Sequence, residues 1–295
     1  MKALITGADG QLGWELHRTR PDDWEIIALS HSDLDITDNP AVTSAIHKHK
    51  PDLVINTAAY TAVDKAESEK DKAYAVNAGG AENIAKAAKD SRIRLLHIST
   101  DFVFDGSKSQ PYLPGDRQNP TSVYGASKLQ GELAVLAAGM HEALILRTGW
   151  VYSSHGSNFV KTMLKLMAAR DEISVVADQV GTPTWARGLA KAIYHFSDKP
   201  EAHGIYHWTD AGVASWYDFA VAIQEEAFKL GLLEKMIPIT PIRTQDYPTP
   251  AKRPSYSVLD KTATWDALGY FASHWRSSLR QMLTEMKSKK QKETD

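Results

Sequence analysis

The N-terminal segment constrains the fold most, because it joins an apolar run to a helical pattern through a glycine-rich loop. Residues 1–6 form a short apolar run typical of a buried strand, and residues 14–18 continue as a helix. Gly7, Gly10 and Gly13 lie in the loop and at the start of the helix. Glycines permit a tight turn and a close approach of the backbone to a bound group, and a helix N-terminus favours an anion. We therefore predict that this loop binds the pyrophosphate of a dinucleotide.

Strands and helices are expected to alternate through the first half of the chain. Apolar runs indicate strands at residues 25–29, 53–58, 95–99 and 144–148, and helical patterns separate them at residues 40–49, 66–90 and 123–138. This alternation predicts an α/β fold, with a Rossmann-type doubly wound parallel sheet covered on both faces. Ligands of such sheets bind at the carboxyl ends of the strands, so residues that follow each run are candidates for the site.

The alternation fades after Thr148. Helical patterns at residues 159–170, 187–196 and 216–230 are separated by loops that contain prolines. We expect residues 1–150 to form an NAD(P)-binding domain and residues 151–295 to form mainly a smaller α/β substrate-binding lobe. Segments near residues 173–176 and 204–208 are expected to return to the first sheet.

Composition favours an enzyme over a nucleic-acid-binding or membrane protein. The chain has 295 residues, 43% of them hydrophobic, which is enough to bury a large core. Its net charge of −2 argues against a nucleic-acid partner, and no apolar run approaches the roughly 20 residues that span a bilayer. The absence of cysteine excludes thiolate chemistry and fits a reducing compartment, so we expect a cytoplasmic protein.

Tyr124 and Lys128 are four residues apart in a helical pattern, so both side chains are expected on one helix face. Of the 11 tyrosines only Tyr124 has a lysine at this offset, although chance supplies about one such pair in a chain of this length. An isolated phenol, with a pKa of ~10, releases its proton reluctantly at neutral pH, and a neighbouring ammonium stabilises the phenolate. We expect Tyr124 to act as an acid whose pKa is lowered by Lys128.

Several motifs in order carry a resemblance to a known family. The glycine loop, the segments 56–61 and 99–106 and the Tyr124–Lys128 pair resemble the extended short-chain dehydrogenase/reductase superfamily. Within it, the chain is most similar to the dTDP-4-dehydrorhamnose reductase family. Further matching segments lie at residues 62–67, 147–152, 158–163, 178–184 and 248–254, and the resemblance covers residues 1–285.

The resemblance implies an NAD(P)H-dependent reduction of the C4 ketone of dTDP-6-deoxy-L-lyxo-4-hexulose, a nucleotide sugar, to dTDP-L-rhamnose. Tyr124 would give its proton to the developing alkoxide. Lys128 would hold the nicotinamide ribose, and Thr100 would orient the ketone. Two alternatives stay open, namely another nucleotide-sugar epimerase, dehydratase or reductase, and a non-catalytic regulatory subunit related to that of methionine adenosyltransferase. Intact Thr100, Tyr124 and Lys128 argue against the regulatory subunit.

The expected cofactor contacts follow the strand ends. The pyrophosphate is expected near Gly7, Gly10, Gln11, Leu12 and Gly13, the adenosine near Ser30, Asp35 and Ile36, and the ribose and pyrophosphate above Ala58, Ala59, Tyr60 and Thr61. An NAD-specific site usually has an acid after the second strand, where this chain has Ser30 and His31. We therefore expect NADPH to be preferred and NADH to be accepted, with Arg18 or His31 as candidate phosphate contacts.

The substrate-binding candidates are Thr100, Asp101, Trp150, Asn158 and Arg253. Asp101 either binds sugar hydroxyls or holds its loop, and Trp150 either faces the sugar nucleotide or packs in the core. Arg253 suits a diphosphate, because a guanidinium matches phosphate oxygens, but a surface ion pair is the alternative.

Some members of the family are dimers bridged by magnesium, so a homodimer is one expectation. The chain has Glu15 and Glu285 at two of the implied ligand positions, but Arg187 at the third. A cation there would repel a metal and would itself pair with the two glutamates. We therefore predict that the protein has no structural magnesium and no metal-binding residues.

Overall fold

Six parallel strands form the central sheet of the computed structural model, which describes residues 1–140 and 142–294, with side chains up to Lys289. The strand order is β10-β5-β4-β3-β1-β2, so the predicted doubly wound parallel sheet is confirmed. The chain leaves β1 for β2 on one side and returns for β3 on the other, which opens a crevice above β1 and β3. The strands are β1 (Lys2–Thr6), β2 (Glu25–Leu29), β3 (Leu53–Asn56), β4 (Arg94–Thr100), β5 (Leu144–Thr148) and β10 (Gly204–His207).

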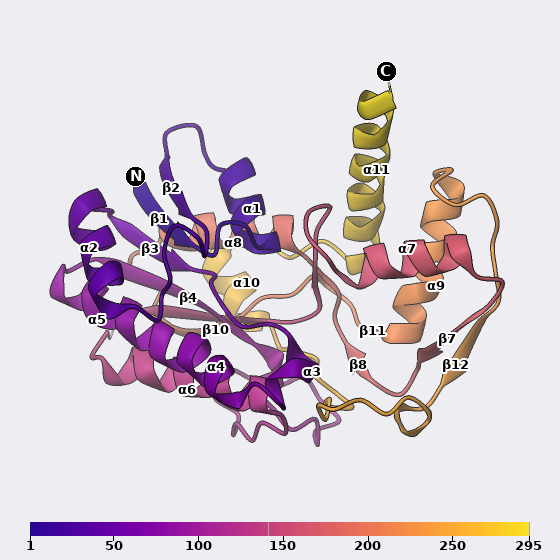
Figure 1. Ribbon diagram of the computed structural model, residues 1–295, viewed down its shortest axis with the longest axis horizontal. Coiled ribbons are helices and arrows are strands. Elements are labelled where there is room, and N and C mark those ends of the chain that lie inside the picture. The colour runs from indigo at the N-terminus through magenta and orange to yellow at the C-terminus, as the bar shows by residue number, and fades with distance from the viewer. Residues whose placement is uncertain (141, 295) are drawn as a thin grey trace.

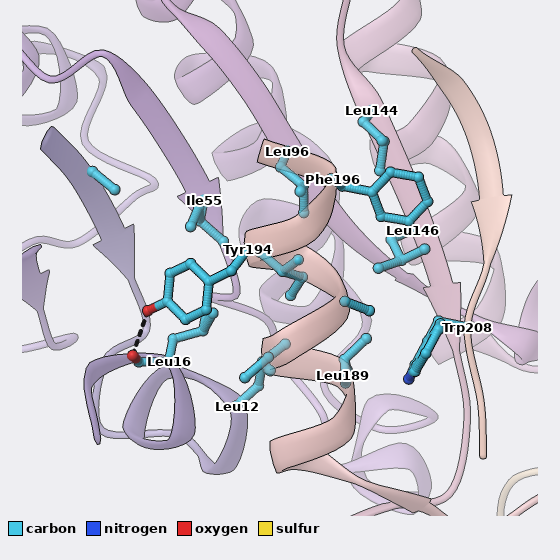
Figure 2. Packing of buried hydrophobic residues seen from close by; sticks show 14 of the residues in the cluster. Leu12, Leu16, Ile55, Leu96, Leu144, Leu146, Leu189, Tyr194, Phe196 and Trp208 are labelled. Atoms are coloured by element: carbon cyan, nitrogen blue, oxygen red, sulfur yellow. Dashed lines mark hydrogen bonds between the residues drawn. The ribbon is translucent and has the colours of Figure 1, made fainter. Parts of the chain in front are cut away.

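Alternate residues of the strands face two helical layers. In β1, Ala3 and Ile5 pack against α1 and α8, whereas Leu4 packs against α2 and α5. Figure 2 shows the first layer, in which the Tyr194 hydroxyl donates to the Leu16 carbonyl and ties α8 to α1. The period of two along each strand thus supplies apolar residues to both faces. The helices of this part are α1 (Gln11–Arg18), α2 (Asn39–His49), α3 (Val63–Ala66), α4 (Lys70–Tyr74), α5 (Ala81–Asp90), α6 (Val123–Ala137), α8 (Ala186–Ser197) and α10 (Thr262–Leu268).

A second hydrophobic core lies beside the sheet and is built mainly by the helices α7, α9 and α11. Figure 1 shows these three helices apart from the helices that cover the central sheet. Short strand pairs surround it, β6 with β9, β7 with β12 and β8 with β11. None of the helices in the described part of the chain has the length and hydrophobicity to cross a bilayer. The elements are α7 (Phe159–Ala169), α9 (Trp216–Lys229), α11 (Trp275–Thr294), β6 (Val151–Tyr152), β7 (Ile173–Val176), β8 (Val180–Gly181), β9 (Thr184–Trp185), β11 (Ala214–Ser215) and β12 (Ile239–Ile242).

One of the two segments expected to return to the first sheet does so. β10 pairs with β5 in parallel, but β7 pairs with β12 instead, so the expectation for residues 173–176 was wrong. The helix expected at residues 66–90 is also divided. It becomes α3, α4, a π-helical turn η1 (Ala75–Gly80) and α5, and π turns often occur at functional sites.

Candidate active site

The glycine loop and the segment after β3 meet at the crevice above β1 and β3. Gly7 has a φ of 69°, and a Cβ on it would lie 2.8 Å from the backbone nitrogen of Ala58. A Cβ on Gly13 would lie 2.4 Å from the carbonyl oxygen of Gly7. Only glycine therefore allows the loop to pack so closely against the segment after β3.

Three backbone amides at the start of α1 are free to bind a ligand. Gly10 N donates to Gly7 O at 3.0 Å and Trp14 N donates to Gly10 O at 2.9 Å. Among the described residues, nothing accepts from the amides of Gln11, Leu12 and Gly13. Unpaired amides at a helix N-terminus, with the positive end of the helix dipole, are suited to a pyrophosphate. The residues present therefore fit the dinucleotide that the loop predicts.

The end of β2 carries a carboxylate that the sequence interpretation missed. Asp33 Oδ2 accepts from Ser30 N at 2.9 Å and from Ser30 Oγ at 2.6 Å. These bonds lower the pKa of Asp33, which is therefore ionised at neutral pH. An acid thus lies at the end of β2 after all, brought there by a turn, and it weakens the argument for NADPH from Ser30 and His31.

Asp35 and Ile36, the other residues expected near the adenosine, form hydrogen bonds with Thr37 and Asn83. Asp35 Oδ1 accepts from Thr37 N at 2.9 Å and from the Thr37 hydroxyl at 2.8 Å. Ile36 is buried, and its carbonyl accepts from Asn83 at 3.0 Å. Both residues lie in the turn that follows β2, as a role beside the adenosine requires.

The segment 58–61 is fixed by Asn77 in the π-helical turn. Asn77 Oδ1 accepts from Tyr60 N at 2.8 Å, and its Nδ2 donates to Tyr60 O at 3.1 Å. Nδ2 also lies 2.9 Å from the hydroxyl of Ser127, on the helix that carries Tyr124. Asn77 is buried and was missed in the sequence, because nothing local marks an amide that closes a contact with residues 17 and 50 positions away.

The expected catalytic residues come together at the carboxyl end of β4. Thr100 ends β4, and its side chain lies close enough to Tyr124, near the start of α6, to affect the pKa of the phenol. The Tyr124 ring packs edge-on against Phe102, with centroids 5.6 Å apart. Lys128, one turn along α6, is buried and donates to the carbonyl of Ile98 at 2.7 Å. Thr100 and Tyr124, which are 24 residues apart in the sequence, thus lie in the same candidate active site.

The pKa values of this group differ from the sequence-based expectation. Burial raises the pKa of Tyr124 to about 12, a hydrogen bond with Thr100 opposes the rise, and the charge of Asp101 adds to it. Burial lowers the pKa of Lys128 to about 8, opposed by Glu132. The expected lowering of the Tyr124 pKa by Lys128 is therefore not found, because desolvation of the phenolate raises that pKa instead. At neutral pH the phenol is protonated and the amine is mostly charged.

Asp101 is buried behind Thr100 and acts on its loop. Its Oδ1 accepts from the Thr100 hydroxyl at 3.1 Å, and the Ser257 side chain lies close enough to affect its pKa. Burial raises the pKa of Asp101 to about 6, opposed by the bonds with Ser257 and Thr100. Of the two roles considered for Asp101, these contacts favour holding the loop.

Trp150 packs against the second core and lies close to Gly181. Its ring stacks on Trp216, with centroids 3.4 Å apart and planes 3° from parallel. A Cβ on Gly181 would lie 2.6 Å from Cε2 and Nε1 of the same ring. Trp150 has a φ of 50°, rare for a bulky residue, and remains partly exposed. The strained backbone and the clamped ring suit a side chain that must present one edge to a ligand.

Asn158 lies beside the glycine loop. Its Nδ2 donates to Gln11 Oε1 at 2.9 Å and to Ser153 O at 2.7 Å, while its Oδ1 accepts from Lys161 N at 3.1 Å. Asn158 therefore caps α7 and orients Gln11. These contacts favour a role on the cofactor side over the substrate contact expected from the sequence.

Arg253 is paired with a carboxylate of the first domain. Its Nη1 donates to Asp64 Oδ1 at 3.0 Å and its Nη2 to Asp64 Oδ2 at 2.8 Å. Arg253 also lines a cavity of about 600 Å³, together with Lys252, Tyr247 and Asp105. Arg253 thus forms the ion pair that was one alternative, and it also lines a cavity with room for the diphosphate that was the other.

The pairing expected for Arg187 is confirmed. Arg187 Nη2 lies 2.5 Å from Glu285 Oε2, and its Nε lies 3.7 Å from Glu15 Oε2. Arg18 pairs with Glu15 at 2.6 Å and with Glu285 at 3.3 Å, contacts that favour a structural role over the phosphate contact suggested from the sequence. Glu15 is fully buried and also accepts from Ser153 at 3.0 Å. The network ties α1, α8 and α11 together.

Comparisons with known proteins agree over almost the whole chain. The family model described as the RmlD substrate binding domain matches residues 1–288. A dTDP-4-dehydrorhamnose reductase from Aggregatibacter actinomycetemcomitans is 44% identical over 286 residues, which are 95% of this chain and 97% of that protein.

Solved structures give the same result. A dTDP-4-dehydrorhamnose reductase from Clostridium acetobutylicum superposes with a TM-score of 0.90 at 42% identity, covering 97% of this chain and 99% of that one. A dTDP-4-dehydrorhamnose reductase from Bacillus anthracis, in complex with NADP, has a TM-score of 0.91 at 36% identity, with 96% and 99% covered. The similarity thus includes both the central sheet and the second core.

Proposed function

The chain belongs to the RmlD substrate-binding-domain family, with dTDP-4-dehydrorhamnose reductases among its relatives, and from this premise we propose that it reduces the C4 ketone of dTDP-6-deoxy-L-lyxo-4-hexulose to dTDP-L-rhamnose. The observation that carries the proposal is the group formed by Thr100, Tyr124 and Lys128 at the same sheet edge as the free amides of α1. A proton donor and a dinucleotide site side by side are what a ketone reduction requires.

The three residues divide the work on the ketone. A bound reduced nicotinamide supplies the hydride. When the ketone binds, the Thr100 hydroxyl turns from Asp101 to the ketone oxygen, donates to it and orients it. Tyr124 gives its phenolic proton to that oxygen as negative charge develops there. Lys128, charged at neutral pH, stabilises the resulting phenolate and holds the ribose hydroxyls of the cofactor. Solvent then returns a proton to Tyr124.

The cofactor is proposed to lie with its pyrophosphate on the amides of Gln11, Leu12 and Gly13 and its ribose over residues 58–61. Residues 1–150 supply these contacts, while residues 151–295 mainly bind the sugar nucleotide. A B. anthracis relative was solved with NADP, which supports the use of NADPH. The Asp33 carboxylate at the end of β2 supports acceptance of NADH as well.

Trp150 and Arg253 are the proposed contacts of the sugar nucleotide. The clamped Trp150 ring supports a contact with the sugar, and the cavity beside Arg253 supports a place for the diphosphate. A dehydratase is less well supported, because Asp101 is buried against Thr100 and Ser257.

Turnover of the 4-keto sugar nucleotide tests the proposal. The wild-type protein is mixed with NADPH or NADH, and oxidation of the cofactor is followed with product analysis by mass spectrometry. We expect a product two mass units heavier than the ketone, formed with one equivalent of cofactor oxidised. If the wild-type protein oxidised neither cofactor in the presence of this substrate, the proposed function would be wrong.

A further inference from the structure

Residues 62–67, which we call the bridging segment, contact two parts of the proposed site. The segment contains α3 and follows directly after residues 58–61. At one end, Asp64 accepts from Arg253. At the other, Glu67 Oε1 accepts from Val123 N at 2.8 Å, on the residue that precedes Tyr124. The bridging segment is thus anchored to the helix that carries the proposed acid.

The Asp64–Arg253 pair fixes one edge of the guanidinium and leaves another open. Asp64 accepts from both Nη1 and Nη2, and Thr249 Oγ1 accepts from Nη1 at 2.7 Å. Within the described part of the chain nothing accepts from Nε. A guanidinium carries five N–H groups, and its Nε and Nη2 donors form a second fork that matches two phosphate oxygens. The open edge is therefore the one that a phosphate would use.

The open edge lies within reach of the reacting centre. Arg253 lines the cavity of about 600 Å³ together with Lys252, a second cation, and the carboxylates of Asp105 and Asp178. Four residues further on, the Ser257 side chain lies close enough to Asp101, the neighbour of Thr100, to affect the pKa of that carboxyl. Four residues span at most about 14 Å, which brings Arg253 within the reach of a sugar nucleotide whose C4 lies at Thr100.

We propose that Asp64 is a positioning residue, which holds the Arg253 guanidinium so that its Nε edge meets the diphosphate of the sugar nucleotide. The inference rests on the proposed function and gives a role to the bridging segment. A free arginine side chain loses much rotamer freedom on binding, and a carboxylate that fixes it beforehand removes that cost from substrate binding. Because Glu67 anchors the segment to α6, the diphosphate site and the acid keep a fixed spacing.

If Asp64 instead competed with the diphosphate for Arg253, its removal would strengthen substrate binding rather than weaken it. If Asp64 were an anion that the diphosphate must displace, removing its charge would free Arg253 and tighten binding. The free Nε edge makes displacement unnecessary, and the bond from Ala251 N to Asp64 Oδ1 at 3.2 Å keeps the carboxylate in place.

The experiment measures binding of dTDP by calorimetry and the kinetics of the sugar nucleotide for wild type, Asp64→Asn, Arg253→Gln and the double variant. Asp71→Asn is the matched control, because it removes the same charge from an exposed site on α4. We expect Asp64→Asn to raise the Kd for dTDP and the KM for the sugar nucleotide about tenfold, with kcat and the cofactor KM unchanged. The control should match the wild type.

The double variant identifies the route of the effect. If Asp64 acts through Arg253, the Asp64→Asn change adds nothing in the Arg253→Gln background. Tighter dTDP binding by Asp64→Asn, an unchanged Kd, or additive losses in the double variant would each overturn the inference. Those results leave the proposed function standing as long as the wild type turns over the sugar nucleotide, so the two failures are distinguishable.

Discussion

The Thr100 hydroxyl donates to the buried carboxylate of Asp101 at 3.1 Å, and Thr100 Oγ1 accepts from the amide of Phe102 at 3.2 Å. Asp101 therefore accepts the single hydroxyl proton of Thr100 until a ketone oxygen replaces it as the acceptor. A carboxylate buried at this place also stores free energy, because its charged form is poorly solvated. The site is thus prepared at some cost to stability.

Asp101→Asn should flatten the pH dependence of stability between pH 3.8 and about 6. The pKa of Asp101 is raised in the folded state, so the folded protein binds more protons than the unfolded chain in this window. The contribution of Asp101 to the free energy of unfolding is therefore complete below its unfolded-state pKa. It is lost as the pH rises through the folded-state pKa, by about 3 kcal/mol in total. Urea unfolding of wild type and variant at several pH values measures the difference. Equal slopes in both proteins would contradict the burial argument.

Asp33→Asn should shift cofactor preference toward NADPH. The ionised Asp33 carboxylate lies at the end of β2, where it would accept from an adenosine 2′-hydroxyl and repel a 2′-phosphate. The ratio of kcat/KM for NADPH to that for NADH should rise several-fold in the variant. Asp22→Asn, an exposed change before β2, serves as the control and should leave the ratio as in the wild type. A constant ratio in Asp33→Asn would mean that Asp33 does not face the ribose.

Arg187→Ala should destabilise the protein through the buried Glu15. The change leaves Glu15 with Arg18 alone and removes the closest partner of Glu285. Since Arg187 is partly exposed, we expect a loss of about 1–3 kcal/mol, below the value for a fully buried pair. Lys235→Ala breaks an exposed pair with Asp171 and should cost less than about 1 kcal/mol. Equal changes in Tm for both variants would show that burial of Glu15 carries no special cost.

Trp216→Leu should weaken substrate binding through Trp150. The two rings stack 3.4 Å apart, and loss of the stack frees the Trp150 side chain. We expect a higher KM for the sugar nucleotide and an unchanged KM for the cofactor. A variant that raised both equally, with a lower Tm, would point to general loosening of the second core.

Local patterns predicted the parts of the site that consecutive residues build. The strand, the glycine loop and the start of α1 are contiguous, and the four-residue spacing of Tyr124 and Lys128 follows from one helix. Dinucleotide binding by the loop and proton donation by Tyr124 could therefore be predicted from the sequence. The pairing of Arg187 with two glutamates was also predicted, because a cation at a position that the family gives to a carboxylate has few other partners.

Other features depend on contacts between distant segments. Asn77, Glu67 and Ser257 act through partners 17 to 156 positions away, and no short pattern marks them. Asp33 reaches the end of β2 only because the chain turns there. The apolar run at residues 173–176 suits a strand in either sheet, so its pairing with β12 was decided by the second core.

Substitution of Tyr124 by phenylalanine tests the central claim most directly. The variant keeps the ring that packs on Phe102 and removes only the hydroxyl that would give the proton. Single-turnover reduction of the 4-keto sugar nucleotide should slow by on the order of 10²-fold or more, while binding of dTDP and of the cofactor stays as in the wild type. A Tyr124→Phe variant that reduced the ketone at the wild-type rate would contradict the account.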